Sequence, residues 1–87
     1  MSISAQQRDP EPVASTVDFA EDMICLELSD GRQIRTPLEF YPRLAKASAE
    51  QLRKFRLIAG GTGIHWDELD EDLSVDSIVN GRRAVSR

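Results

Sequence analysis

The sequence predicts a small α+β domain, in which helices pack on one face of a mainly antiparallel sheet. Three observations predict this class. The 87 residues suffice for one small hydrophobic core and no second one. Short runs alternate apolar and polar residues, as half-buried strands do. Serine and proline signals mark short helices after the third strand and at the end. Together they predict the order β-β-β-α-α-β-β-α.

The N-terminal residues differ from the rest of the chain. Residues 1–12 are polar and contain two prolines, a composition typical of a disordered tail, so the predicted domain is residues 13–87. The start lacks the basic and apolar runs of a secretory signal, and no apolar stretch of about 18 residues could span a membrane. A single cysteine cannot form an internal disulfide, so the sequence indicates a cytoplasmic protein.

Three strands open the predicted domain. The apolar residues of the first two alternate with polar ones, at Val17 and Phe19 and then at Ile24, Leu26 and Leu28. Asp30-Gly31 indicates a turn after the second strand. We favour a loop over residues 29–31, because it sets Leu26 against Ile34 and Ile24 against Thr36 and keeps the apolar side chains on one face. Pro37 ends the third strand, since it cannot donate a ladder hydrogen bond.

Two short helices are predicted next. Pro42 fits the first turn of a helix that runs to Ala47, because its missing N–H is not needed there. Ser48, with Gln51 three residues later, forms a capping box that begins the second helix.

Two strands and a last helix complete the order. Leu57-Ile58 and residues 64–66 have strand character and are joined by the glycine-rich residues 60–63. Ser74 caps a helix that runs to about Val79. Gly81 follows its end, where a left-handed residue is common.

Charge is distributed in blocks along the chain. The net charge is −4 and the pI is about 4.9. A basic segment, residues 31–56, lies between two acidic ones. The pattern favours ordinary solvated faces, with neutralisation of the charges within the fold as the alternative. The bases of the segment offer a stripe for nucleic acid, but the flanking acids repel phosphate, so direct nucleic-acid binding is not expected. The bases concerned are Arg32, Arg35, Arg43, Lys46, Arg53 and Lys54.

Few residues have the types and spacing that a metal, phosphate or catalytic site requires. His65 is the single histidine, and Asp67, Asp70 and Asp72 follow it, but transition-metal sites usually recruit more imidazole or thiolate. The glycine-rich residues 60–63 lack the helix and the lysine of a phosphate loop. No serine or cysteine is tied to an oriented base. We therefore predict no catalytic residue, no bound metal and no cofactor, and expect no enzyme.

Two long runs carry a family resemblance. SDGRQIRTPLEFYPRLAKAS and LIAGGTGIHWDELDEDLSVDSIVNG resemble the small bacterial domain of unknown function 2442 family, over about residues 15–81. The resemblance implies a small α+β domain and no established activity, and it supplies no catalytic residues. It also implies stand-alone members, members fused to a helix-turn-helix domain, and members encoded beside another small protein as in a toxin–antitoxin pair.

The sequence thus favours a small protein-interaction module, the antitoxin-like acidic half of a two-protein bacterial system. Its expected partner is the product of an adjacent gene, with a homo-oligomer as an alternative that would protect open sheet edges. We predict that polar and aromatic side chains bind the partner: Tyr41, Arg43, His65, Trp66, Asp70 and Asp72. For Tyr41 and Trp66 the alternative is a place in the core, which the small number of aromatic residues favours. The alternative hypothesis is a metal- or anion-binding sensory or enzymatic domain that uses His65 and the neighbouring aspartates.

Overall fold

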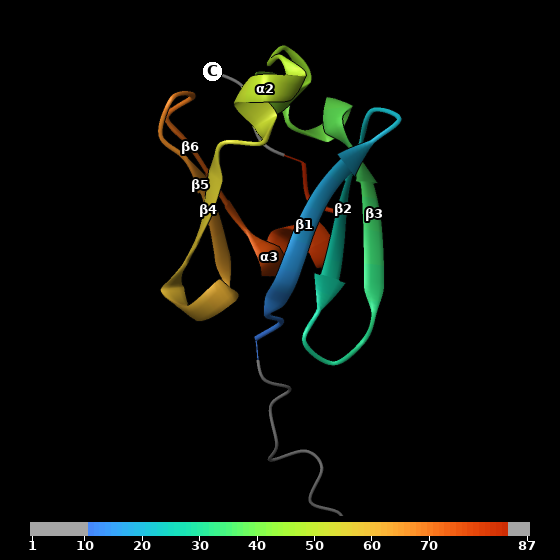
Figure 1. Cartoon of the computed structure of the whole chain (residues 1–87). Coiled ribbons are helices and arrows are strands. Elements are labelled where there is room, and N and C mark those ends of the chain that lie inside the picture. The colour runs from blue at the N-terminus through green and yellow to red at the C-terminus, as the bar shows by residue number, and fades with distance from the viewer. Residues whose placement is uncertain (1–10, 84–87) are drawn as a thin grey trace, which may run out of the picture.

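The computed structural model describes residues 11–83, which form two three-stranded antiparallel sheets (Figure 1). Sheet A has the order β1-β2-β3 and consists of β1 (Ala14–Ala20), β2 (Met23–Leu28) and β3 (Gln33–Pro37). Sheet B has the order β4-β5-β6 and consists of β4 (Phe55–Ile58), β5 (Gly63–Trp66) and β6 (Glu71–Ser74). Most of the predicted N-terminal tail, residues 1–10, lies outside the described residues.

Five short helices accompany the two sheets in the described residues, and three of them connect sheet A to sheet B. The 3-10 helix η2 (Leu38–Phe40), α1 (Pro42–Ala45) and α2 (Ala49–Leu52) lie at one end of the sheets (Figure 1). The 3-10 helix η3 (Ala59–Gly61) joins β4 to β5, and α3 (Val75–Val79) contacts both β6 and β3. Within the described part of the chain, every helix is too short to cross a bilayer.

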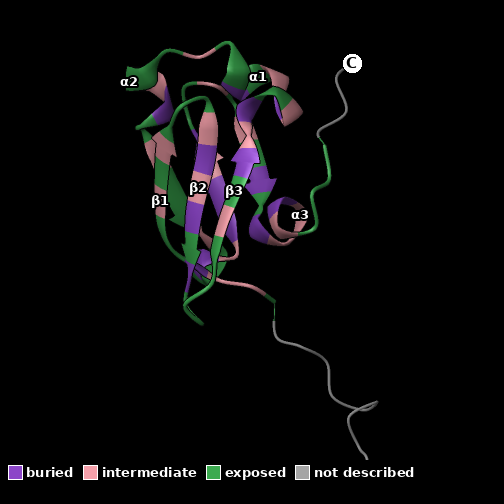
Figure 2. Cartoon of the chain, turned by 90° about the vertical axis from the view of Figure 1, so that its right-hand side faces the viewer, coloured by how far each residue is buried: buried purple, intermediate pink, exposed green. Residues whose placement is uncertain are grey.

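The predicted class and the register of the second hairpin are confirmed. Leu26 pairs with Ile34 and Ile24 with Thr36, as the loop over residues 29–31 requires. Gly31 adopts a φ of +94° and donates its N–H to the carbonyl of Leu28. The apolar side chains of β2 therefore share one face, and Figure 2 shows the resulting alternation of burial along this strand.

The predicted helix signals are also confirmed. Pro42 occupies the first turn of α1. The Ser48 hydroxyl and the Gln51 side chain form both bonds of the capping box. The Ser74 hydroxyl accepts the N–H of Ser77 at the start of α3.

The structure differs from the prediction in three respects. It adds β6, whose residues Glu71–Ser74 carry one apolar side chain and so no alternation that the sequence could show. It divides the strands between two sheets, with α1 and α2 at one end of them instead of on one face. Finally, α1 ends at Ala45, two residues before the predicted end, and Lys46 follows as its C-cap residue, with its N–H bonded to the carbonyl of Pro42.

Trp66 joins the sheets. Its side chain is fully buried, and its ring lies 6.4 Å from Phe19 of sheet A and 6.5 Å from Phe55 of its own sheet. Its indole N–H donates to the carbonyl of Leu52 at 3.0 Å, which fixes the end of α2. The remaining core consists of Tyr41 and of aliphatic side chains from both sheets, η2, α1, α2 and α3.

The glycine-rich residues 60–63 form a tight connection. Gly61 adopts a φ of +94° and is buried against the first residues of β1. A Cβ at this position would lie 2.7 Å from Val13 Cγ1 and 3.0 Å from the carbonyl oxygen of Ala14. Glycine is therefore required here both by the left-handed backbone and by the close approach of a second segment.

We expect Gly61→Ala to destabilise the fold more than Gly31→Ala does. Gly31 has the same φ of +94°, but a Cβ there would meet nothing within 4 Å, so its substitution measures backbone strain alone, about 1–2 kcal/mol. Gly61→Ala adds a steric clash to that strain. Urea unfolding of both variants measures the difference, and equal losses of stability would show that η3 moves away from β1 freely.

Candidate functional site

The outer face of sheet B carries a row of charged and polar side chains. Arg56 of β4 pairs with His65 of β5, and His65 pairs with Asp72 of β6, so the three lie side by side across the sheet. Neighbouring residues in a strand point to opposite faces. The burial of Trp66 in the core therefore places His65 on the outer face.

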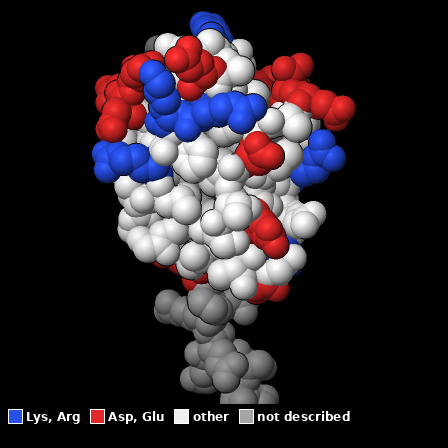
Figure 3. Space-filling view, viewed as in Figure 1, with Lys and Arg blue, Asp and Glu red and all other residues white. Residues whose placement is uncertain are grey.

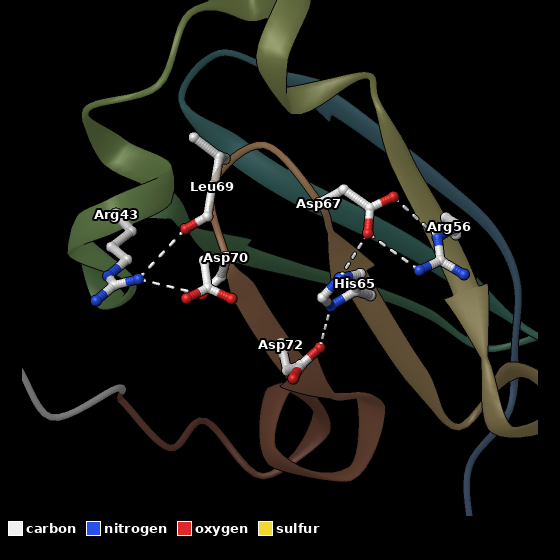
Figure 4. A network of polar contacts seen from close by, with 7 residues as sticks. All are labelled: Arg43, Arg56, His65, Asp67, Leu69, Asp70 and Asp72. Carbon is white, nitrogen blue, oxygen red and sulfur yellow. Dashed lines mark hydrogen bonds and ion pairs between the residues drawn. The ribbon is translucent and has the colours of Figure 1, made fainter.

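His65 is held between two carboxylates (Figure 4). Its Nε2 lies 2.8 Å from Asp67 Oδ1, and its Nδ1 contacts Asp72 Oδ1. Arg56 donates two hydrogen bonds to the same Asp67, from Nε to Oδ2 at 3.2 Å and from an Nη to Oδ1 at 3.0 Å. Asp67 thus bridges a guanidinium and an imidazole, and the histidine side chain is only 21% exposed.

The turn between β5 and β6 is held by a second arginine (Figure 4). An Nη of Arg43 donates to the carbonyls of Leu69 at 3.3 Å and Asp70 at 3.1 Å, and its Nε lies 3.9 Å from Glu71. These bonds fix Asp70, whose φ of +51° is left-handed. The strain of this turn is thereby offset by charge-assisted bonds from α1.

Acidic and basic segments meet in this region, which is the alternative that the charge distribution left open. Lys54 pairs with Glu68 at 3.2 Å, next to the Arg56 and Arg43 contacts. Figure 3 shows acidic and basic side chains gathered at the end of the molecule that carries the helices and the β5–β6 turn, above a largely uncharged face. Most bases of the predicted stripe have an acidic partner: Arg32 with Asp30, Arg35 with Glu21, Arg43 with Glu71 and Lys54 with Glu68.

The contacts of this network shift its pKa values. The hydrogen bond to Asp72, with a smaller effect from Asp67, raises the pKa of His65 above its ordinary value. The hydrogen bond from Arg56 lowers the pKa of Asp67. The contacts of the row therefore favour the protonated form of the imidazole over the neutral form.

The prediction that Tyr41 and Trp66 are exposed binding residues is wrong. Tyr41 is 1% exposed and Trp66 is 0% exposed, because a chain with five aromatic residues uses its largest side chains to fill the core. The structure leaves Arg43, His65, Asp70 and Asp72 at the surface, on α1, β5, the following turn and β6. Sequence reasoning omitted Arg56, whose role depends on the pairing of β4 with β5.

The alternative hypothesis is a metal site, and this network offers no set of free ligands for one. Across residues 11–83, no group of three or more histidine, cysteine or acidic residues is placed to hold an ion. Both nitrogens of His65 already contact carboxylates, and Asp67 is also bound by Arg56.

Comparison with known proteins gives a family and a fold. The family described as Protein of unknown function (DUF2442) matches residues 14–84. A crystal structure of a protein of unknown function from Rhodospirillum rubrum is 27% identical, covers 87% of this chain and 94% of its own, and superposes with a TM-score of 0.76. The solution NMR structure of an uncharacterised protein from Chromobacterium violaceum is 24% identical, covers 85% of this chain and 70% of its own, and has a TM-score of 0.71. No curated protein matches the chain.

We expect an NMR titration of the single histidine to give a pKa above about 6.5, its unperturbed value. Because folding raises this pKa, the stability that His65 contributes is fully present below about pH 6.5 and is lost as the pH rises through the folded-state pKa. The difference in unfolding free energy between the native chain and His65→Gln should shrink over that interval.

Two variants distinguish the effects of the two carboxylates on the pKa of His65. Asp72→Asn should lower the pKa of His65 more than Asp67→Asn does, because Asp67 is shared with Arg56. The reverse order would contradict the assignment of Asp72 as the main partner.

Proposed function

The chain belongs to the DUF2442 family, which names no activity, and from that premise we propose that it is a small protein-interaction module, the acidic half of a two-protein bacterial system. The docking surface is the outer face of sheet B with the β5–β6 turn, and it is defined by Arg43, Arg56, His65, Asp67, Asp70 and Asp72. The partner is a protein with a complementary charge pattern, encoded beside this chain, and both act in the cytoplasm.

The observation that carries this proposal is a pre-organised charge pattern that remains accessible to a partner. The side chains of Asp67 and Asp72 are 68% and 69% exposed, and that of Arg56 is 58% exposed, although all three are held in place by neighbours. Exposed ion pairs add little to stability. Charges arranged in a fixed pattern on a sheet favour instead the selection and orientation of a complementary partner.

The acidic side chains of the docking surface indicate the sign of the partner's charge. Among residues 11–83, Asp70 has no ion-pair partner, and Asp72 is paired with His65 alone. Together with the net charge of −4, this favours basic side chains opposite the turn and β6.

The open edges of the sheets support an interaction role in a second way. In the described fold, β6 and β4 are the outer strands of sheet B, and β1 and β3 are those of sheet A. An outer strand leaves backbone N–H and C=O groups available to a partner. The docking surface borders two of these edges, so an extended partner segment has backbone groups to pair with as well as charges to meet.

Co-expression of the chain with the product of its neighbouring gene tests the proposal. We expect size exclusion with light scattering to show a stable complex, and Asp72→Lys to weaken it at least about tenfold by reversing a charge at the docking surface. Glu27→Lys is the matched control, because Glu27 is an exposed acid on β2 of the other sheet. It should leave the complex intact.

Two results would contradict the proposal. One is a monomer or homodimer that ignores the neighbouring product. The other is equal weakening by Asp72→Lys and Glu27→Lys, which would indicate attraction by net charge without a docking surface.

A further inference from the structure

A cavity of about 250 Å³ opens beside β6, between that strand, α3 and the segment that follows α3. It is smaller than the ~300–1,000 Å³ typical of pockets for drug-sized ligands, so any occupant is a small molecule. Seven polar or charged residues line it: Tyr41, Glu71, Asp72, Ser74, Ser77, Arg82 and Arg83.

Tyr41 brings an unsatisfied polar group to this cavity. The residue is 1% exposed, and its hydroxyl has no hydrogen-bond partner among the described residues. The ring is fixed in place, because the Tyr41 N–H donates to the carbonyl of Leu38 and the next residue, Pro42, begins α1. A buried hydroxyl without a partner is destabilising, and Tyr41 lines the cavity, so a ligand or water that reaches the hydroxyl from there would satisfy it.

The two sides of the cavity differ in charge. β6 supplies the carboxyl group of Glu71, which lies on the same face as Trp66, whereas that of the next residue, Asp72, lies on the outer face with His65. The Glu71 side chain is 16% exposed, and burial raises its pKa. The Nε of Arg43 lies 3.9 Å from Glu71 Oε1, which is beyond hydrogen-bond distance. The carboxyl group can therefore accept a hydrogen bond from a ligand.

The segment after α3 supplies the positive charges. The N–H of Arg82 donates to the carbonyl of Ser77 at 2.9 Å, just after Gly81 turns the chain with a φ of +71°. The guanidinium of Arg83 lies 4.2 Å from the centre of the Phe40 ring. Among residues 11–83, neither arginine has an ion-pair partner, so both guanidinium groups have hydrogen-bonding capacity for a carboxylate.

We propose that this cavity binds a small zwitterion of the α-amino-acid class. Its carboxylate meets Arg82 and Arg83, its ammonium group meets Glu71, and one of its polar atoms bonds the Tyr41 hydroxyl. A simple anion would leave the Glu71 carboxyl group without a donor, and a simple cation would be repelled by the two arginines. A molecule with both charges satisfies both sides.

The test uses the whole chain without a partner protein, so it is independent of the proposed docking function. L-alanine, L-leucine, L-glutamate and L-lysine are added one at a time, at about 10 mM, and followed by ¹⁵N NMR. We expect at least one of them to shift the resonances of β6 and of residues 77–83. The N-acetyl derivative and the methyl ester of that amino acid, which each remove one charge, should bind at least about tenfold more weakly.

Two variants assign the residues. Tyr41→Phe should weaken binding about two- to tenfold, while the Tm of the ligand-free chain stays the same or rises because a buried unpaired hydroxyl is removed. Arg82→Gln should weaken binding at least about tenfold, and Arg53→Gln, an exposed arginine at the end of α2, should not change it.

The proposal is overturned if none of the four amino acids shifts residues that line the cavity. It is equally overturned if the derivatives bind as well as the amino acid, or if Tyr41→Phe leaves the affinity unchanged.

Discussion

The packing of Trp66 between the two sheets is the constraint from which the rest of the molecule follows. This one side chain contacts Phe19 of sheet A and Phe55 of sheet B, and its indole N–H is bonded to the end of α2. Its burial fixes which face of β5 points inward. His65, the preceding residue, must therefore face outward, and the strand register then brings Arg56 and Asp72 to its sides. The core thus determines where the polar surface lies.

The polar surface in turn shows how a chain with segregated charge avoids repelling itself. The basic segment enters the helical end of the molecule and lies against the acidic β5–β6 turn, so Arg43, Lys54 and Arg56 each meet an acid or a carbonyl of that turn. The exposed pairs contribute little to the free energy of folding. Their effect is to hold Asp67, Asp70 and Asp72 in one geometry, which is the property a docking surface needs.

Local signals in the sequence are sufficient to predict the local structure. The loop over residues 29–31, the capping box at Ser48 and the Ser74 cap depend on residues close together in the chain, and all three are present in the structure. The strand β6 escapes prediction because Glu71–Ser74 shows no alternation, and its pairing with β5 supplies the order that its own residues lack. For Tyr41 and Trp66 the sequence favours the core but leaves a surface role open, since an amphipathic aromatic residue suits both places until its neighbours in space are known.

The claim that one core unites both sheets is tested most directly by urea unfolding of Ile24→Val. Ile24 is fully buried in sheet A, and its loss of one methyl group costs about 0.5–1.5 kcal/mol, which leaves the chain folded. Trp66 is the single tryptophan, so its fluorescence reports the unfolding of sheet B, while far-UV circular dichroism reports both sheets. The account predicts that the two midpoints coincide and fall together in the variant. A fluorescence midpoint that stays at its native value while the circular dichroism transition moves would show that the sheets unfold separately and that Trp66 does not join them.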